Sequence, residues 1–297
     1  MLPQAVEIAG DNRHLCKERG FLAIYEQNEL LGRLPIDDLS LVLVCGYGVT
    51  WSNDLLASLS ERCIPVVICG KNMNPLSMLW SLSGHHRSSE RIRSQAVVSV
   101  PTQKRLWQSI IKAKILLQAK HVALRGEKFG HLVELASSVR SGDTGNVEAI
   151  AASLYWRLCF GMDFKRDRMG SGANSLLNYG YTVLRACMAR AIMLSGLHPA
   201  FGIFHRNARN PMPLVDDLME PFRPVVDMVV LHIKHHLGVE VNPDTKRILS
   251  GIPSLDMTVK GELSTVGRCI REAADSLAAV YLGQQDELVL PKELIPL

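Results

Sequence analysis

Two glutamates and one histidine are the residues best suited to metal-dependent chemistry. They are Glu148 in GNVEAIAASLYW, His205 in GIFHRNARNP and Glu220 in DDLMEPFRP. Two carboxylates and one imidazole suit Mg²⁺ or Mn²⁺, which favour oxygen ligands and keep water molecules for a substrate phosphate. A zinc site would more typically use further histidine or cysteine ligands. The expected chemistry is therefore phosphoryl transfer, in which the cation polarises the scissile phosphate and neutralises charge in the transition state.

Each of these residues also has an ordinary structural explanation. Glu148 follows Asn146, a predicted helix cap, so its carboxylate would favour the positive end of the helix dipole. His205 follows an apolar helix end and could be a simple loop histidine. Asp217 and Glu220 are three residues apart and would share a helix face, where like charges repel unless a cation or arginine lies between them. The residues taken singly leave both interpretations open.

Two other patterns are weaker. His232 and His236 in LHIKHHLGVE would lie one helical turn apart and could hold a metal ion, but no third ligand is evident nearby, which favours a solvated helix end. Gly46-Tyr47-Gly48 follows an expected strand, as dinucleotide loops do. It lacks their third glycine and the lysine of a Walker loop, so a tight turn is predicted.

The elements that must position these residues form two parts. Strand-like runs at 21–25, 30–34, 41–45 and 65–69 alternate with turn residues, and NDLLASLSER is a short helix that Ser52 can cap. After Pro101 the apolar period becomes helical, with further helices at roughly 128–140, 146–160, 174–195, 213–237 and 264–282. Pro221 and Pro224 fall inside one of these helices, where each would cost about 3 kcal/mol.

These elements predict an α+β protein with a small β-sandwich-like domain and a larger all-α catalytic domain. The polar, basic stretch SLSGHHRSSERIRSQ separates the two. We place the β domain at 1–83, a linker at 84–96 and the α-helical domain at 97–297.

The bulk composition predicts a cytoplasmic protein with a sizeable core. Of the 297 residues, 47% are hydrophobic, and the sequence has neither a membrane-length apolar run nor the pattern of a signal peptide at MLPQAVEIAGDNRHL. Seven scattered cysteines without a Cys-x-x-Cys pair favour reduced, mostly buried thiols. The net charge of +4 permits nucleic-acid binding without demonstrating it. Five basic residues near the candidate site could contact a DNA backbone: Lys165, Arg166, Arg168, Arg206 and Arg209.

Five segments, taken together, resemble the CRISPR-associated protein one family, the integrase of spacer acquisition. They are GDTGNVEAIAASLYW, DFKRDR, NSLLNYGYTVLRA, GIFHRN and DDLMEPFRPVVD, and the resemblance covers nearly the whole chain. The N-terminal GYGVTWSNDLLASLSERCIPVVIC is similar to the family's β domain. The short length is most similar to the form encoded beside the RNA-guided effector nuclease of type II systems.

The resemblance implies a ligand set and partners. Glu148, His205 and Glu220 match the family's metal ligands, and Asp217 matches a supporting acidic position. Arg206 stands where the family often has an acid. The β domain is expected to form a homodimer, and a small ferredoxin-like CRISPR-associated protein two is the expected partner, with the effector nuclease as a further one.

The implied reaction is a transesterification. The 3′-hydroxyl of a captured double-stranded DNA fragment attacks a phosphodiester at each end of a CRISPR repeat. Two alternatives remain open at this point. The same residues would serve a stand-alone metal-dependent DNA endonuclease with water as nucleophile. A non-catalytic DNA-binding scaffold would be expected to lack a ligand position, whereas all three are present here.

Overall fold

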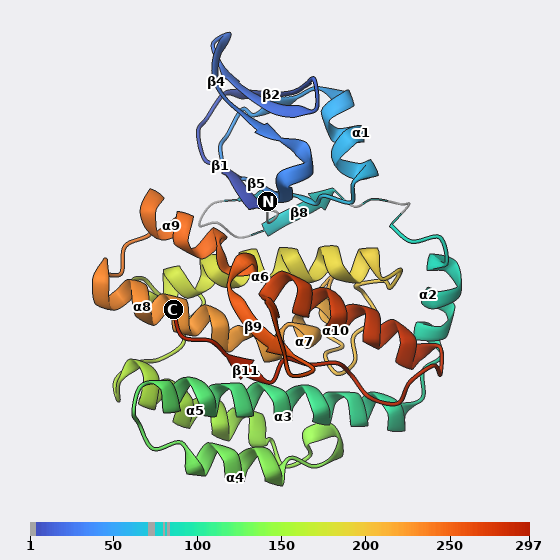
Figure 1. The fold of residues 1–297 in the computed structure, drawn as a ribbon, viewed down its shortest axis with the longest axis vertical. Coiled ribbons are helices and arrows are strands. Elements are labelled where there is room, and N and C mark those ends of the chain that lie inside the picture. The colour runs from blue at the N-terminus through green and yellow to red at the C-terminus, as the bar shows by residue number, and fades with distance from the viewer. Residues whose placement is uncertain (1–3, 71–74, 80, 82–83) are drawn as a thin grey trace. The chain divides into compact units, whose positions relative to one another are not determined.

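The chain separates into two compact units, Met1–His86 and Arg87–Leu297, in the computed structural model, which describes residues 4–70, 75–79, 81 and 84–297 (Figure 1). The predicted linker, 84–96, is mostly helix α2 (Ser88–Ala96) of the second unit. Gln95 explains the difference, because its buried amide donates to the carbonyls of His198 and Phe201 and accepts from the amide of His198. The polar segment that suggested a linker therefore forms a helix packed against the rest of the second unit.

The first unit contains two four-stranded sheets and one helix. One sheet has the order β1-β5-β7-β8 and the other the order β4-β3-β2-β6. The β1–β5 and β5–β7 pairs are parallel, and β7–β8 is antiparallel. The elements are β1 (Gln4–Ile8), β2 (Arg13–Glu18), β3 (Phe21–Glu26), β4 (Glu29–Pro35), β5 (Leu39–Val44), β6 (Thr50–Trp51), α1 (Asn53–Glu61), β7 (Val66–Cys69) and β8 (Pro75–Leu79).

The core of this unit forms between the two sheets and α1. Leu15 and Leu22 from one sheet, Val42 from the other and Leu55 from α1 are buried in one cluster. All six residues of β5 are buried, as expected for a continuous apolar strand with neighbours on both sides. The predicted sandwich-like domain is confirmed. Ser52 does occupy the N-cap position of α1, but its side chain accepts no capping hydrogen bond.

The second unit is mainly helical. Its helices are α2, α3 (Val100–Leu124), α4 (Gly130–Ser138), α5 (Val147–Phe160), α6 (Ala173–Leu194), α7 (Pro213–Leu218), α8 (Arg223–His236), α9 (Pro243–Ser250) and α10 (Val266–Tyr281). The expectation of an all-α domain is too simple, because β9 (Asp256–Val259), β10 (Glu262–Thr265) and β11 (Glu293–Leu294) form a small sheet. No helix among the described residues meets the length and hydropathy needed to cross a bilayer.

Helix α3 and helix α6 organise the packing of this unit. Helix α3 contacts α4, α5 and α8, and α6 contacts α8, α9 and α10. Gly180 in the NYGY sequence allows α6 and α8 to approach closely, because a Cβ there would lie 2.5 Å from Cγ1 of Val226. These contacts bring residues from distant parts of the sequence to the centre of the unit.

The prolines of the EPFRP sequence do not interrupt a helix. Helix α7 ends at Leu218, a 3₁₀ turn η4 (Glu220–Phe222) follows, and α8 begins at Arg223. Pro221 and Pro224 therefore occupy first-turn positions, where the missing amide hydrogen is not needed. The predicted continuous helix over 213–237, with its proline cost, was wrong. Glu220 lies on the turn between the two helices.

Candidate metal centre

The turn GDTGN positions Glu148 at the start of α5. Asn146 is at the N-cap with a left-handed backbone (φ 49°), but its side chain makes no capping bond. The cap is instead Asp143, whose carboxylate accepts from the amides of Val147 (2.9 Å) and Glu148 (3.0 Å). Because Asp143 caps the helix, the carboxylate of Glu148 is not needed as a cap and can bind another partner.

The carboxylates of Glu148 and Glu220 meet at one ammonium group. Nζ of Lys114, on α3, lies 2.5 Å from Oε1 of Glu148 and 2.6 Å from Oε2 of Glu220. Nε of Arg223 lies 2.9 Å from Oε1 of Glu220. Glu220 Oε2 is buried, and the Lys114 ammonium is its charge partner. Two acids from separate elements therefore face a single cation position.

The electrostatics of this group favour the charged forms. Burial alone would raise the pKa of Glu220, but Arg223 and Lys114 hold it below its ordinary value. Burial alone would lower the pKa of Lys114, but Glu220 and Glu148 hold it above its ordinary value. The group is a cluster of buried and part-buried charges that compensate one another.

Asp217 organises the loop that carries His205. Its carboxylate is fully buried, and Oδ2 accepts from the amides of Ile203 (2.7 Å) and Phe204 (2.8 Å). Oδ1 lies 2.5 Å from Nδ1 of His205. Gly202 makes this loop possible, because a Cβ there would lie 2.4 Å from the carbonyl oxygen of His205. Asp217 thus supports His205 directly.

The hydrogen bond to Asp217 selects the form of the His205 ring. An ionised carboxylate can only accept, so Nδ1 carries the proton and donates, and Nε2 has the free lone pair in the neutral ring. This bond raises the pKa of His205; desolvation opposes the rise, and the charges of Asp217, Glu220 and Glu148 reinforce it. The side chain is 46% exposed and packs edge-on against Trp107 at 5.5 Å between ring centroids. His205 is therefore oriented and still accessible.

The donor set fits a divalent cation, although the ligands are not assembled around one position. Within the part of the chain that the structure describes, no three His, Cys, Asp or Glu side chains form a group that could hold a metal ion. The structure brings Glu148 and Glu220 together on Lys114 and pairs His205 with Asp217. The Lys114 ammonium already lies between the two glutamates, and the imidazole has the carboxylate partner typical of metal ligands.

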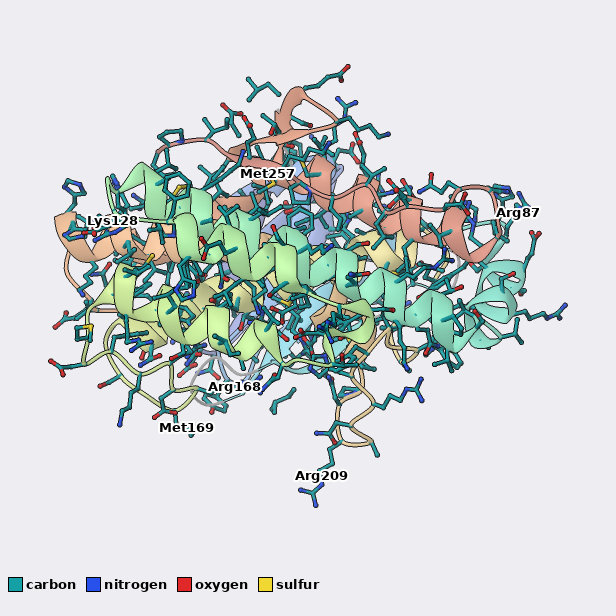
Figure 2. The ribbon with its side chains drawn as sticks, turned by 90° about the horizontal axis from the view of Figure 1, so that it is seen from below. Arg87, Lys128, Arg168, Met169, Arg209 and Met257 are labelled. Atoms are coloured by element: carbon teal, nitrogen blue, oxygen red, sulfur yellow. The ribbon has the colours of Figure 1, made fainter. Side chains whose placement is uncertain are left out.

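The basic residues proposed for DNA contact differ in their surroundings. Arg166 is tied to α6, donating to Asn174 (3.0 Å) and Asn178 (2.6 Å), and so has a structural role. Lys165, Arg168 and Arg209 are exposed, and Figure 2 shows Arg209 at the outer end of its loop. Arg206 is also exposed and donates to Gln103 at 2.8 Å.

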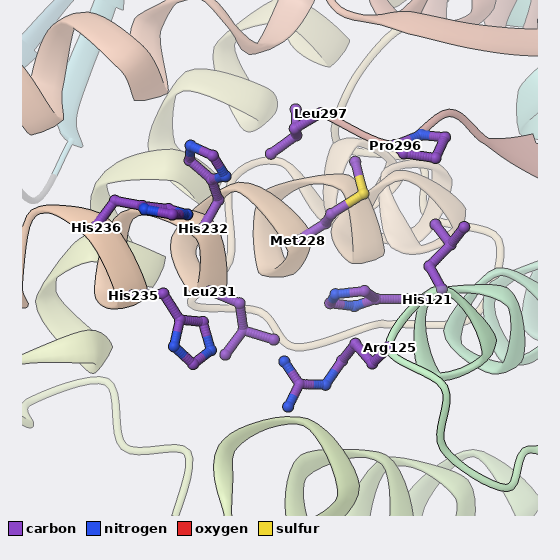
Figure 3. A pocket seen from close by; sticks show the side chains of 10 residues that line it. His121, Arg125, Met228, Leu231, His232, His235, His236, Pro296 and Leu297 are labelled. Atoms are coloured by element: carbon purple, nitrogen blue, oxygen red, sulfur yellow. The ribbon is translucent and has the colours of Figure 1, made fainter.

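The histidines of α8 line a shallow pocket of about 460 Å³ together with His121 and Arg125 (Figure 3). The rings of His232 and His236 lie 4.5 Å apart between centroids. Among the described side chains they belong to no group of three metal ligands. They lie, exposed, near the C-terminal end of α8.

A buried hydrogen-bond network connects α3, α5, α6 and α8. Asp227 on α8 accepts from the hydroxyls of Tyr155 (2.9 Å) and Tyr181, and Nδ1 of His121 lies 2.7 Å from the Tyr155 hydroxyl. Burial lowers the pKa of His121 to about 4, so its ring is neutral. Because the Tyr155 hydroxyl donates its hydrogen to Asp227, Nδ1 of His121 donates to the Tyr155 oxygen. The guanidinium of Arg223 lies 4.8 Å from the Tyr181 ring centroid. The network therefore borders the charged group around Glu220.

Asp227 should make stability depend on pH. Burial raises its pKa from 3.8 to about 6 despite the two tyrosine hydroxyls. Because the folded pKa exceeds the unfolded one, the native state binds the proton more tightly, and stability falls as pH rises from about 4 to about 6. The full loss is about 3 kcal/mol, of which about 1 kcal/mol falls between pH 5 and pH 7.5.

Urea unfolding of the wild type and Asp227→Asn at these two pH values isolates this contribution, since other titrating groups affect both proteins. We expect the stability of the variant relative to the wild type to improve by about 1 kcal/mol at the higher pH. An identical difference at pH 5 and pH 7.5 would contradict the assignment.

Sequence reasoning missed Lys114, Arg223 and Asp143 as members of the site. A signal for Lys114 existed: it stands three and four residues from Ile111 and Ile110 on the buried face of α3. A lysine at such a position needs an acidic partner. No comparable local signal marks Arg223.

The chain is thus a two-unit α+β protein, with a β unit followed by a mainly helical unit. Two convergent carboxylates and a carboxylate-supported histidine give the helical unit an acidic centre suited to a divalent cation. The family model for CRISPR associated protein Cas1 matches residues 6–241. The chain is 34% identical to the CRISPR-associated endonuclease Cas1 of Neisseria meningitidis serogroup C over 92% of this chain and 91% of the relative. The chain belongs to the Cas1 family.

Solved structures share the fold. A casposase bound to integration product matches with a TM-score of 0.80 at 19% identity, over 97% of this chain and 93% of the other. A Cas6-RT-Cas1–Cas2 complex matches with a TM-score of 0.75 at 16% identity, over 97% of this chain and 36% of the other, longer chain. At these identities the likeness concerns the fold alone.

Proposed function

We propose that this Cas1 family member is a metal-dependent DNA integrase of CRISPR adaptation. The observation that carries the proposal is the convergence of Glu148 and Glu220, from separate elements, on one cation position. His205, with its Nδ1 engaged by Asp217, is the third ligand in this proposal through Nε2. When bound, Mg²⁺ or Mn²⁺ supplies Lewis-acid polarisation of the phosphate.

The proposed reaction exchanges one phosphodiester for another. The 3′-hydroxyl oxygen of the DNA fragment bonds to phosphorus in the repeat, and the bond from that phosphorus to the neighbouring 3′ oxygen breaks. The released oxygen takes up a proton and becomes a new 3′-hydroxyl. No water and no covalent enzyme intermediate are required, so the chain's contribution is positioning and charge compensation.

The proposed partners are double-stranded DNA, a Cas2-type protein and a second copy of this chain. The casposase bound to integration product and the Cas6-RT-Cas1–Cas2 complex, which share the fold, support the first two by analogy. Lys165, Arg168, Arg206 and Arg209 are the exposed cations that we assign to DNA phosphates. The homodimer is supported by β4, an edge strand whose Leu30 and Leu31 are 43% and 50% exposed.

A stand-alone endonuclease is the second candidate, because the curated relative is named an endonuclease. The substrate's 3′ end separates the two. We expect joining of a 3′-hydroxyl duplex to a plasmid carrying a repeat, in the presence of a Cas2-type partner and Mg²⁺ or Mn²⁺. EDTA should stop joining, and so should a blocked 3′ end. Cleavage that persists with blocked ends would favour the endonuclease, and undiminished joining in EDTA would contradict the proposal.

A further inference from the structure

Lys114 occupies the place between the two candidate metal ligands. Its side chain is only 10% exposed, and Nζ lies 2.5 Å from Glu148 and 2.6 Å from Glu220. The ammonium thus contacts one oxygen of each carboxylate. A buried ammonium at this place compensates two carboxylates that would otherwise repel each other across a short gap.

The same two oxygens are those that a divalent cation would need. An ion bound between Glu148 and Glu220 would have to displace the ammonium from at least one of them, because Mg²⁺ and Mn²⁺ require direct oxygen contacts. Lysine is suited to such an exchange, since its charge is a compact group on a flexible four-carbon stem. Arg223 contacts the other oxygen of Glu220 and does not occupy the gap.

We propose that Lys114 is a built-in counter-ion, which holds the Glu148–Glu220 pair together in the metal-free protein and is displaced when the divalent cation binds. This inference rests on the proposed metal-dependent function. Metal binding is then an exchange of cations, and the protein's affinity for metal is set partly by competition with its own lysine. Lys114 is in this sense a positioning residue for the metal ligands.

The exchange has two measurable consequences. Without the ammonium, the metal-free protein loses a buried charge partner and should unfold at a lower temperature. Metal binding to that protein meets no competitor, so it should be tighter, and the stabilisation by saturating metal should be larger. A purely structural lysine would lower the unfolding temperature equally with and without metal.

The test compares the wild type with Lys114→Met, and with Lys104→Met as a control at an exposed position of the same helix. Thermal unfolding is followed in EDTA and in saturating Mn²⁺, and Mn²⁺ binding is measured by calorimetry. We expect Lys114→Met to unfold below the wild type in EDTA and to recover most of the difference in Mn²⁺. Its Kd for Mn²⁺ should be about tenfold lower than that of the wild type, equivalent to roughly 1.4 kcal/mol. Lys104→Met should match the wild type throughout.

Lys114→Gln provides a second variant that is neutral but keeps a hydrogen-bond donor, and it should shift in the same direction. If neither variant folds in EDTA, recovery of the fold on adding Mn²⁺ supports the exchange, and failure to recover overturns it. Equal or weaker Mn²⁺ binding by folded Lys114→Met also overturns it. Absence of Mn²⁺ binding to the wild type would instead remove the metal-dependent function on which the inference rests.

Discussion

Replacing Glu220 by glutamine should reduce strand joining by about a thousandfold, equivalent to roughly 4 kcal/mol in the barrier. The amide has nearly the shape of the carboxylate but no charge, so it weakens the proposed cation site without emptying the space. The reason for so large an effect is burial: Glu220 is 6% exposed, so bulk solvent compensates little for the missing charge. The measurement is the initial rate of joining at saturating Mn²⁺.

The same substitution should cost stability, which must be separated from the loss of activity. Lys114 and Arg223 would both lose a charged partner, and breaking a buried pair costs about 3 kcal/mol or more. Joining is therefore compared at a temperature at which circular dichroism shows the variant to be folded. Glu134→Gln, an exposed position on α4, is the matched control and should retain full activity. A folded Glu220→Gln that joins DNA within a few-fold of the wild type would refute the assignment.

Asp217→Asn should separate orientation of the imidazole from its presence. In the variant, the amide oxygen can still accept from Ile203 and Phe204, which leaves the NH₂ group facing Nδ1 of His205. Nδ1 must then accept, so the neutral ring carries its hydrogen on Nε2 and loses the lone pair that a metal would use. We expect joining to fall by about 10- to 100-fold, the usual effect of removing the partner of a metal-ligating histidine.

A double-mutant cycle with His205→Ala tests this coupling. If Asp217 acts through the ring, the double variant should lose no more activity than His205→Ala alone, because the asparagine then has no ring to misorient. Urea unfolding of all the proteins reports on the separate contribution of Asp217 to the loop. Losses of joining that add independently would show that Asp217 acts otherwise than through His205.

The types of most elements followed from periodicity. The strands around 21–26, 41–44 and 66–69, helix α1, and helices α5, α6 and α10 lie where apolar spacing and turn residues indicated. Helix α2 was missed because a polar, basic segment is typical of a linker, and only tertiary hydrogen bonds to Gln95 reveal its packing. The boundary of α7 and α8 was missed for a related reason, since a 3₁₀ turn leaves almost no trace in the hydrophobic pattern.

The candidate ligands, by contrast, are the part of the site that could be predicted from the sequence. Glu148, His205 and Glu220 stood out because each is a metal-binding type of residue beside a turn or helix terminus, and the five motifs together pointed to the family. Their partners were not visible. The spacing predicted that Asp217 and Glu220 would share a helix face and repel each other. Instead, Asp217 accepts hydrogen bonds from backbone amides and His205, and Glu220 pairs with Lys114 and Arg223.

Sequence by itself therefore indicated the class of fold, most of its helices and strands, and the acids and histidine that are candidate ligands. Tertiary structure decided which charges face one another. The physical reason is that helix caps, turns and amphipathic faces depend on neighbours within a few residues, whereas ion pairs such as Lys114–Glu148 join residues 34 positions apart. Such a pair forms only when tertiary packing brings the distant segments together and buries their charges within reach of one another.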